Sequence, residues 1–148
     1  MSLTFKRGHA DDLTAVYKLN CEFFSESWSL AGLQGALEEG YELFCCMDKN
    51  TLAGYLLSHD VLDEVHIMQV VVALPYRRKN IAEQLSRDLL NIKPNRRLLL
   101  EVRASNHAAQ ALYAKLEFVR SGVRKAYYVP EHKGDAREDA ILMHYPPK

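Results

Sequence analysis

The fold is decided between Val65 and Val102, where the chain reads VHIMQVVVALPYRRKNIAEQLSRDLLNIKPNRRLLLEV. Residues 65–73 are an almost continuous run of branched apolar residues, and Pro75 ends it, which predicts a strand buried on both faces. Apolar residues then recur at helical spacing over residues 81–92, and a second apolar strand follows at residues 97–102. A strand–helix–strand unit of this kind predicts two parallel strands joined by a right-handed crossover.

Outside this unit the pattern predicts an α/β protein (α+β by some schemes) whose sheet is mixed and mostly antiparallel, flanked by about four helices. The further strands are expected at residues 3–7, 43–47, 52–57, 118–129 and 139–145, and the further helices after Asp11 or Asp12, after Trp28–Ser29 and near Asn106. Asp11 or Asp12 is expected to cap the first helix. No linker, repeat or low-complexity stretch interrupts the chain, so we expect one domain over residues 1–148.

Composition narrows the class of protein. With 148 residues, 48% hydrophobic and 26% charged, the chain is typical of a single globular domain. Its apolar runs are far shorter than a membrane span needs, and its start has no signal-peptide pattern. Three cysteines, two of them adjacent at Cys45 and Cys46, and six scattered histidines give neither a disulfide framework nor a metal-site spacing. We therefore expect a cytoplasmic protein with no metal and no membrane contact.

Charge is balanced overall but not along the chain. The 19 basic and 19 acidic residues cancel, which argues against a dedicated nucleic-acid partner. Residues 1–74 hold 4 Lys/Arg against 11 Asp/Glu, whereas residues 75–148 hold 15 against 8. The second half could bind an anionic ligand and the first a cationic one, or the two could be solvated surfaces without ligands.

A basic turn, YRRKNIA at Tyr76–Ala82, stands between the buried strand and the amphipathic helix. The start of a helix presents unpaired backbone N–H groups and the positive end of the helix dipole, which suits a diphosphate. The alternative is a solvated basic loop that caps the helix. The chain has no G-x-S-x-G, Walker, H-E-x-x-H or G-x-G-x-x-G motif, so hydrolase, NTPase, metalloenzyme and dinucleotide-binding classes are disfavoured.

Several short motifs then carry a family resemblance. They are LEVRASN at residues 100–106, Leu112–Tyr113, LEF at residues 116–118, Tyr127–Tyr128, REDA at residues 137–140 and VLDE at residues 61–64. These motifs resemble the GNAT superfamily of acetyl-CoA-dependent N-acetyltransferases, and within it the RimI-type branch, the ribosomal-protein-alanine N-acetyltransferases. The resemblance is dense from Val61 to Met143 and thin before Tyr41. It implies the GNAT fold, in which the two parallel strands splay apart.

The resemblance also implies how acetyl-CoA is held. The family's pyrophosphate turn reads Q/R-x-x-G-x-G/A, and Arg77, Asn80 and Ala82 take its fixed positions, with Asn80 where glycine is usual. Asn tolerates a positive φ but adds a side chain, and Glu83 adds negative charge beside the expected anion. The full set implied for the cofactor is Val70, Val71, Val72, Arg77, Arg78, Lys79, Asn80, Ile81, Ala82, Glu83 and Asn106. The valine side chains themselves suit the core, and Asn106 could be a simple N-cap.

Two residues match the family's catalytic pair. By this resemblance Glu101 is the general base, acting through water, and Tyr113 is the general acid that protonates the departing thiolate. Taken alone, Glu101 could form a structural ion pair with a neighbouring arginine, and Tyr113 could be a core residue. All three cysteines lie outside the motif region, so direct transfer is favoured over an acyl-enzyme.

The RimI-type resemblance implies that the acceptor is the N-terminal alanine of a small-subunit ribosomal protein with a basic tail. Candidate substrate residues are Trp28, Asp63, Glu64, Tyr127, Tyr128, Glu138 and, with less support, Glu26. Each could instead be an ordinary surface or core residue. Two other functions stay open: acetylation of lysine, a polyamine or another small amine, and a non-catalytic acyl-CoA-binding module. We expect a monomer or weak dimer.

Overall fold

The structure is a computed structural model of the chain, and it describes residues 1–24, 27–130 and 134–147. The strands are β1 (Leu3–Arg7), β2 (Glu42–Asp48), β3 (Thr51–Val61), β4 (Glu64–Val72), β5 (Arg97–Arg103), β6 (Val119–Tyr128) and β7 (Glu138–Tyr145). The helices are α1 (Leu13–Phe23), α2 (Leu30–Glu38), α3 (Ile81–Ile92) and α4 (His107–Lys115), with 3-10 turns η1 (Ala10–Asp12) and η2 (Leu74–Tyr76). The expected elements are therefore present, although β3 extends further than residues 52–57.

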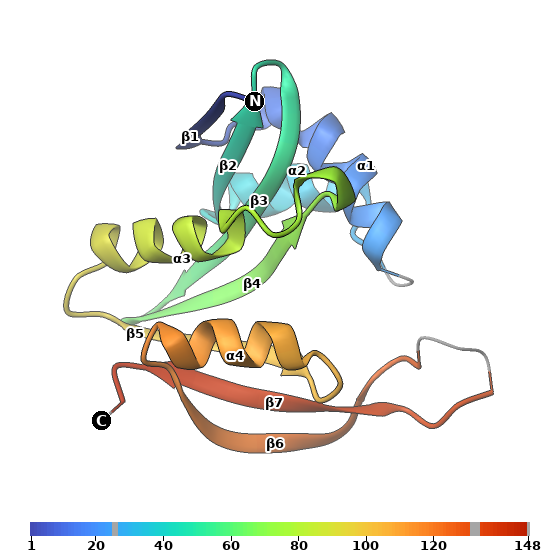
Figure 1. Cartoon of the computed structure of the whole chain (residues 1–148), viewed down its shortest axis with the longest axis vertical. Helices are drawn as coiled ribbons and strands as arrows, with labels where there is room; N and C mark the ends of the chain where they lie inside the picture. The colour runs from blue at the N-terminus through green and yellow to red at the C-terminus, as the bar shows by residue number, and fades with distance from the viewer. Residues whose placement is uncertain (25–26, 131–133, 148) are drawn as a thin grey trace.

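The strands form one mixed sheet in the order β1-β2-β3-β4-β5-β7-β6. Every neighbouring pair is antiparallel except β4 and β5, which are parallel as predicted. Their pairing is short, since it starts at Glu64 with Arg97 and stops at Ile67 with Leu100. β4 continues to Val72 and β5 to Arg103, so the two strands diverge at their carboxyl ends (Figure 1). We call this opening between residues 68–72 and residues 101–103 the seam.

Two helices pack on each face of the sheet. One core cluster joins α3 and α4 to the sheet and includes Leu85, Leu89, Leu100, Val102 and Tyr113. A second cluster joins α1 and α2 to β2, β3 and β4 on the other face. Figure 1 shows α4 lying along β6 and β7, while α1 and α2 lie over the half of the sheet that contains β2 and β3. None of the described helices is long and apolar enough to cross a membrane.

The helix starts follow the expected chemistry with one correction. Ser29 caps α2, because its hydroxyl accepts a hydrogen bond from the Gly32 N–H at 2.9 Å. Asp12 precedes α1 but its side chain makes no cap bond to that helix. Instead, the Asp12 carboxylate accepts the His9 N–H at 2.8 Å and Lys6 Nζ at 2.9 Å. The inserted turn η1 is the reason, since it makes His9 the N-cap of that turn and Asp12 the N3 residue whose carboxylate reaches back to the His9 N–H.

Candidate active site

The basic turn between β4 and α3 has an unusual backbone. Arg78 and Asn80 both have positive φ, 64° and 61°, and Asn80 is the N-cap residue of α3. The N–H groups of Asn80, Ile81, Ala82 and Glu83 have no backbone or side-chain acceptor within residues 1–24, 27–130 and 134–147. Left-handed residues next to a helix start turn successive N–H groups toward one side, which makes an anion-binding concavity. Asn80 therefore adopts the positive φ that Asn tolerates better than most residues.

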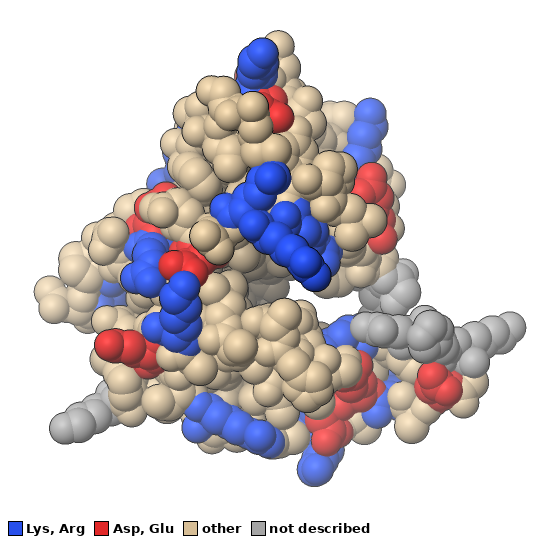
Figure 2. Space-filling model, viewed as in Figure 1, with Lys and Arg blue, Asp and Glu red and all other residues tan. Residues whose placement is uncertain are grey.

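Cationic side chains surround this concavity. Arg78 and Lys79 are exposed, and neither forms an ion pair within the described part of the chain. Arg77 folds back, since its Nε donates to the Val72 carbonyl at 3.0 Å and its guanidinium lies 4.9 Å from the centre of the Phe23 ring. Figure 2 shows a group of Lys and Arg side chains at the rim of a hollow, where the turn into α3 lies in Figure 1. The turn therefore offers both amides and positive charge.

Glu83 does not oppose an anion at this turn as strongly as the sequence suggested. Its carboxylate receives Lys115 Nζ at 2.8 Å and Arg87 Nε at 3.1 Å. These two cations, Lys115 first, hold the pKa of Glu83 below its ordinary value, so the group stays charged but its charge is compensated. The ion pair with Lys115 also links α3 to the end of α4.

The valine segment of β4 borders the seam. Val70, Val71 and Val72 pair with β3, but no residue of β5 pairs with them. Val71 is buried in the second core cluster, as expected of a core side chain, and the Val72 carbonyl is occupied by Arg77. A bound extended chain carrying amide groups could complete the free edge of β4. Free amides at the turn and a free strand edge beside it fit a ligand with a diphosphate and an amide-containing arm, as acetyl-CoA has.

Glu101 lies on β5 at the seam. It alternates with Leu100 and Val102, which face α4, so its side chain lies on the opposite face of the sheet. Glu101 Oε1 is 2.9 Å from Arg124 Nη2 on β6, and the Glu101 side chain is 27% exposed. Glu101 thus forms the ion pair with a neighbouring arginine that was one of the two roles considered for it. The ion pair leaves the carboxylate accessible to solvent.

Tyr113 lies on α4 and is buried among core residues. Its ring packs edge-on against Phe118, with 5.3 Å between ring centres. Burial raises the pKa of Tyr113 to about 12, and the neighbouring Ser86 hydroxyl of α3 opposes that rise. Because Tyr113 packs on the α4 face and Glu101 lies on the other, the structure does not bring the two side chains together.

Asn106 acts as the N-cap of α4, the simpler of its two readings. Its Oδ1 accepts the Ala109 N–H at 3.1 Å. The residue is exposed.

The aromatic and acidic residues near the carboxyl end of the chain form one cluster. Tyr127 and Tyr128 pack edge-on, and Arg103 lies 4.7 Å from the centre of the Tyr128 ring. Arg103 Nη1 is also 3.3 Å from Glu138 Oε1, and the other Glu138 oxygen accepts the Ser105 N–H at 2.5 Å. Ser105 chiefly, together with Arg103, keeps the pKa of Glu138 below its ordinary value. Glu138 therefore ties the start of β7 to the corner between β5 and α4.

The remaining substrate candidates lie in different places. Trp28 packs edge-on against Tyr41, with 5.8 Å between ring centres, and contacts the second core cluster. Asp63 and Glu64 lie at the amino end of β4, the end opposite to the seam, where Glu64 is 3.5 Å from Arg97. The structure therefore does not bring Asp63 or Glu64 together with Glu101. Glu26 lies outside the described residues.

Sequence reasoning missed two features near the seam. One is Arg124, whose contact with Glu101 depends on β6 and β7 following β5 in the sheet. The other is Asn20, which is fully buried on the apolar face of α1. A polar residue at position 20, in helical spacing with Leu13 and Val16, is the signal that could have found it.

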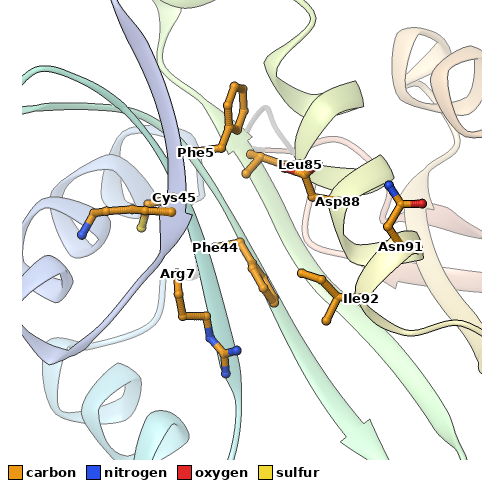
Figure 3. A pocket seen from close by; sticks show the side chains of 9 residues that line it. Phe5, Arg7, Phe44, Cys45, Leu85, Asp88, Asn91 and Ile92 are labelled. Carbon is orange, nitrogen blue, oxygen red and sulfur yellow. The ribbon is translucent and has the colours of Figure 1, made fainter.

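A groove of about 390 Å³ lies elsewhere, along the carboxyl-terminal half of α3 and against β1 and β2 (Figure 3). Among the side chains that line it are Phe5, Arg7, Phe44, Leu85, Asp88 and Ile92. It shares no residue with the turn at the start of α3 or with the seam. The groove is therefore separate from the candidate active site.

Comparisons with known proteins agree with this geometry. The model of the acetyltransferase (GNAT) family matches residues 13–118. A protein of Bacillus subtilis (strain 168) is 34% identical over 138 residues, which cover 90% of this chain and 88% of that protein. The ribosomal protein bS18-alanine N-acetyltransferase of Escherichia coli (strain K12) is 33% identical over 138 residues, covering 91% of each chain. The crystal structure of the Escherichia coli ribosomal-protein-S18-alanine N-acetyltransferase has a TM-score of 0.87 at 32% identity, covering 97% of this chain and 92% of that one.

Proposed function

Because the chain belongs to the acetyltransferase (GNAT) family, we propose that it transfers the acetyl group of acetyl-CoA to the N-terminal α-amine of a protein. We propose the N-terminal alanine of ribosomal protein S18 as the acceptor, since relatives that match nine-tenths of the chain carry that activity in their names. The product is an N-acetylated alanine, and transfer is direct, with no acyl-enzyme.

One observation carries the proposal. The free N–H groups of Asn80 to Glu83 open toward the same end of the sheet at which β4 and β5 diverge. In this proposal the turn amides, with Arg78 and Lys79, hold the diphosphate, and the free edge of Val70–Val72 holds the arm that follows it. The reacting end is thereby directed into the seam, beside Glu101.

When bound, acetyl-CoA supplies a thioester carbonyl that a neutral amine can attack. In this proposal Glu101 takes the proton of the acceptor's ammonium, and the exposure of its carboxylate at the seam supports that role. Tyr113 stays protonated at neutral pH, since burial raises its pKa to about 12, so its hydroxyl is in the state that a proton donor needs. To serve the departing sulfur, that hydroxyl must reach the seam from the α4 face of the sheet.

The acceptor side combines aromatic rings with paired charges. Tyr127 and Tyr128 stand near the carboxyl end of β6, and Arg124 lies over the Tyr127 ring with 4.8 Å between guanidinium and ring centre. In this proposal the peptide lies over the half of the sheet that α1 and α2 leave uncovered. Its ammonium replaces Arg124 beside Glu101, an exchange that costs little because exposed ion pairs contribute only about 0.2–1 kcal/mol.

The test is acetylation of an S18-type peptide beginning Ala-Arg, read as a mass gain of one acetyl group on the intact peptide. We expect Glu101→Gln and Tyr113→Phe to lower turnover strongly while calorimetry finds unchanged coenzyme binding. Glu39→Gln, which changes an exposed carboxylate just after α2, is the matched control and should retain full turnover.

Three outcomes would contradict parts of the proposal. Acetylation of a free polyamine or a lysine side chain, without any gain on the peptide α-amine, would assign another acceptor. Coenzyme binding without turnover on any peptide or amine would make the chain a binding module. Full turnover by Glu101→Gln would remove Glu101 as the base and leave the acceptor assignment untouched.

A further inference from the structure

A buried polar network lies between α1 and the sheet, on the face that α2 also covers. Asn20 is its centre, with an exposed fraction of 0%. Asn20 Nδ2 donates to the Tyr55 hydroxyl at 3.0 Å and to Gln69 Oε1 at 2.8 Å, while Asn20 Oδ1 accepts the Trp28 N–H at 3.0 Å. The Tyr55 hydroxyl in turn donates to Gln69 Oε1 at 2.8 Å. We call Asn20, Tyr55 and Gln69 the Asn20 cluster.

The polar atoms of Asn20 are all hydrogen-bonded, which distinguishes this network from an accidental burial of polar atoms. Both Nδ2 hydrogens of Asn20 and its Oδ1 have partners, and Gln69 Oε1 accepts two hydrogen bonds. Burial raises the pKa of Tyr55 to about 12, so the hydroxyl remains a donor. Apolar residues of the same shape would hold a core together equally well, because a satisfied buried hydrogen bond adds little net stability. What such a network adds is a fixed geometry of the groups that it joins.

The groups that the cluster joins belong to two segments that are far apart in the sequence, the end of β4 and the backbone just before α2. Gln69 follows Ile67, the last residue of β4 that pairs with β5, and directly precedes the Val70–Val72 segment. It therefore lies on the free, splayed part of β4. Trp28 directly precedes Ser29, the N-cap of α2, and packs against Tyr41. One amide side chain thus connects the strand proposed to hold the coenzyme arm with the backbone that leads into α2.

We infer that the Asn20 cluster is a positioning device that fixes the backbone at Trp28 relative to the splayed end of β4. Trp28 thereby forms a wall of the acceptor site at a set distance from the coenzyme arm. None of the three cluster residues touches a reacting atom, so their effect is on placing the acceptor. This inference rests on the proposed function for the identity of the acceptor, but its geometric part can be measured without turnover.

The experiment uses Tyr55→Phe, which removes the shared hydroxyl and keeps the ring. Tyr17→Phe is the matched control, because Tyr17 packs against the same core cluster but its hydroxyl interacts with Cys21. Trp28 is the single tryptophan of the chain, so intrinsic fluorescence reports on it alone. We expect Tyr55→Phe to shift the Trp28 emission and to raise the KM for the Ala-Arg peptide about fivefold, the equivalent of about one hydrogen bond. The KM for acetyl-CoA should stay within about twofold, and Tyr17→Phe should match the wild type in all three measurements.

The inference is overturned if Tyr55→Phe leaves the Trp28 emission and the peptide KM at wild-type values. It is also overturned if both KM values and kcat change by the same factor, because a general loss of packing would do that. If Tyr55→Phe does not fold, Gln69→Met replaces it, since this change removes the acceptor on β4 at similar volume. A wild type that acetylates no peptide would sink the proposed function, whereas the emission comparison would still decide whether the cluster positions Trp28.

Discussion

Replacing Asn80 by alanine removes the side chain that tolerates a left-handed backbone at the start of α3. Asn80 has φ 61° and ψ 25°, and its side chain makes no cap hydrogen bond, so conformation is the main thing that the change alters. A left-handed conformation costs an L-residue about 1–2 kcal/mol, and Asn is among the residues that visit it most readily. Alanine should therefore lose about 1 kcal/mol relative to Asn80.

That loss can emerge in two measurements. If the turn stays left-handed, the free energy of unfolding falls by about 1 kcal/mol, which lowers the Tm of a chain of this length by roughly 3–4 °C. If residue 80 instead leaves the left-handed conformation, the N–H groups at the start of α3 no longer face the diphosphate site. Coenzyme binding must then return the backbone to the left-handed conformation, which costs binding free energy. The Kd for coenzyme A then rises about fivefold, because about 1.4 kcal/mol corresponds to a tenfold change. The two losses together should amount to about 1 kcal/mol.

Calorimetric titration with coenzyme A and thermal melts measure both quantities, and Asn80→Gly is the matched control. Glycine takes the left-handed conformation freely, so the Kd of Asn80→Gly should stay within about twofold of the wild type. Wild-type binding and an unchanged Tm in Asn80→Ala would refute the conformational argument. A much tighter Kd in Asn80→Gly would mean that the Asn80 side chain obstructs the diphosphate site.

Further predictions concern β3 and the β6–β7 hairpin. Gly54→Ala would place a Cβ 2.8 Å from the Val71 carbonyl oxygen, so denaturant unfolding should find it about 1–3 kcal/mol less stable, and an unchanged midpoint would contradict this. Ala126 has φ 49°, so Ala126→Gly should raise stability by about 0.5 kcal/mol, and a lower midpoint would mean that its strain is relieved locally. Glu138 and Asp139 have pKa values below the ordinary 4.5 and 3.8, held there chiefly by Ser105 and by the Ala126 N–H, so the folded chain binds fewer protons than the unfolded one. The stabilisation from these two carboxylates is present above their pKa values and is lost as pH falls through them, so the Tm should drop on acidification. The Tm of Glu138→Gln should fall less steeply with pH than that of the wild type. Equal dependence of Tm on pH in the two proteins would contradict the role given to Glu138.

Much of the fold follows from patterns that local physics controls. The apolar run at residues 65–73, the helical spacing of residues 81–92 and the second strand at residues 97–102 set the parallel pair, and the structure confirms it. The length of that pairing was not predictable from periodicity, because an apolar strand reads the same whether or not its neighbour stays beside it. The side chain of Asp12 does not cap α1 as expected, because Asp12 belongs to the 3-10 turn η1, and a turn this short has no periodicity by which the sequence could reveal it.

In the candidate site, too, features that depend on a single residue could be anticipated from the sequence, whereas long-range contacts could not. Asn80 is a residue type that tolerates the positive φ it adopts, whereas nothing in the residue type of Arg78 indicated its positive φ, since arginine has no preference for it. Long-range contacts such as Arg124 with Glu101 require the strand order, which sequence separation does not reveal. The roles of Glu101 and Tyr113 came from the family resemblance and stay predictions until the variants are measured.

Pairing between β4 and β5 stops at Ile67 and Leu100, so each of these strands has an unpaired edge toward its carboxyl end. The sheet therefore has unpaired edges in its middle as well as at its two edge strands, β1 and β6. An exposed strand edge has unpaired N–H and C=O groups that can pair with another chain and cause aggregation, and proteins usually shorten or cover such edges. Here the unpaired edges belong to two strands in the middle of the sheet, β4 and β5, each of which is paired on its other side. These unpaired backbone groups can therefore bind a thin, flexible ligand such as the coenzyme arm, and they are less open to pairing with a second copy of the chain than the edges at β1 and β6.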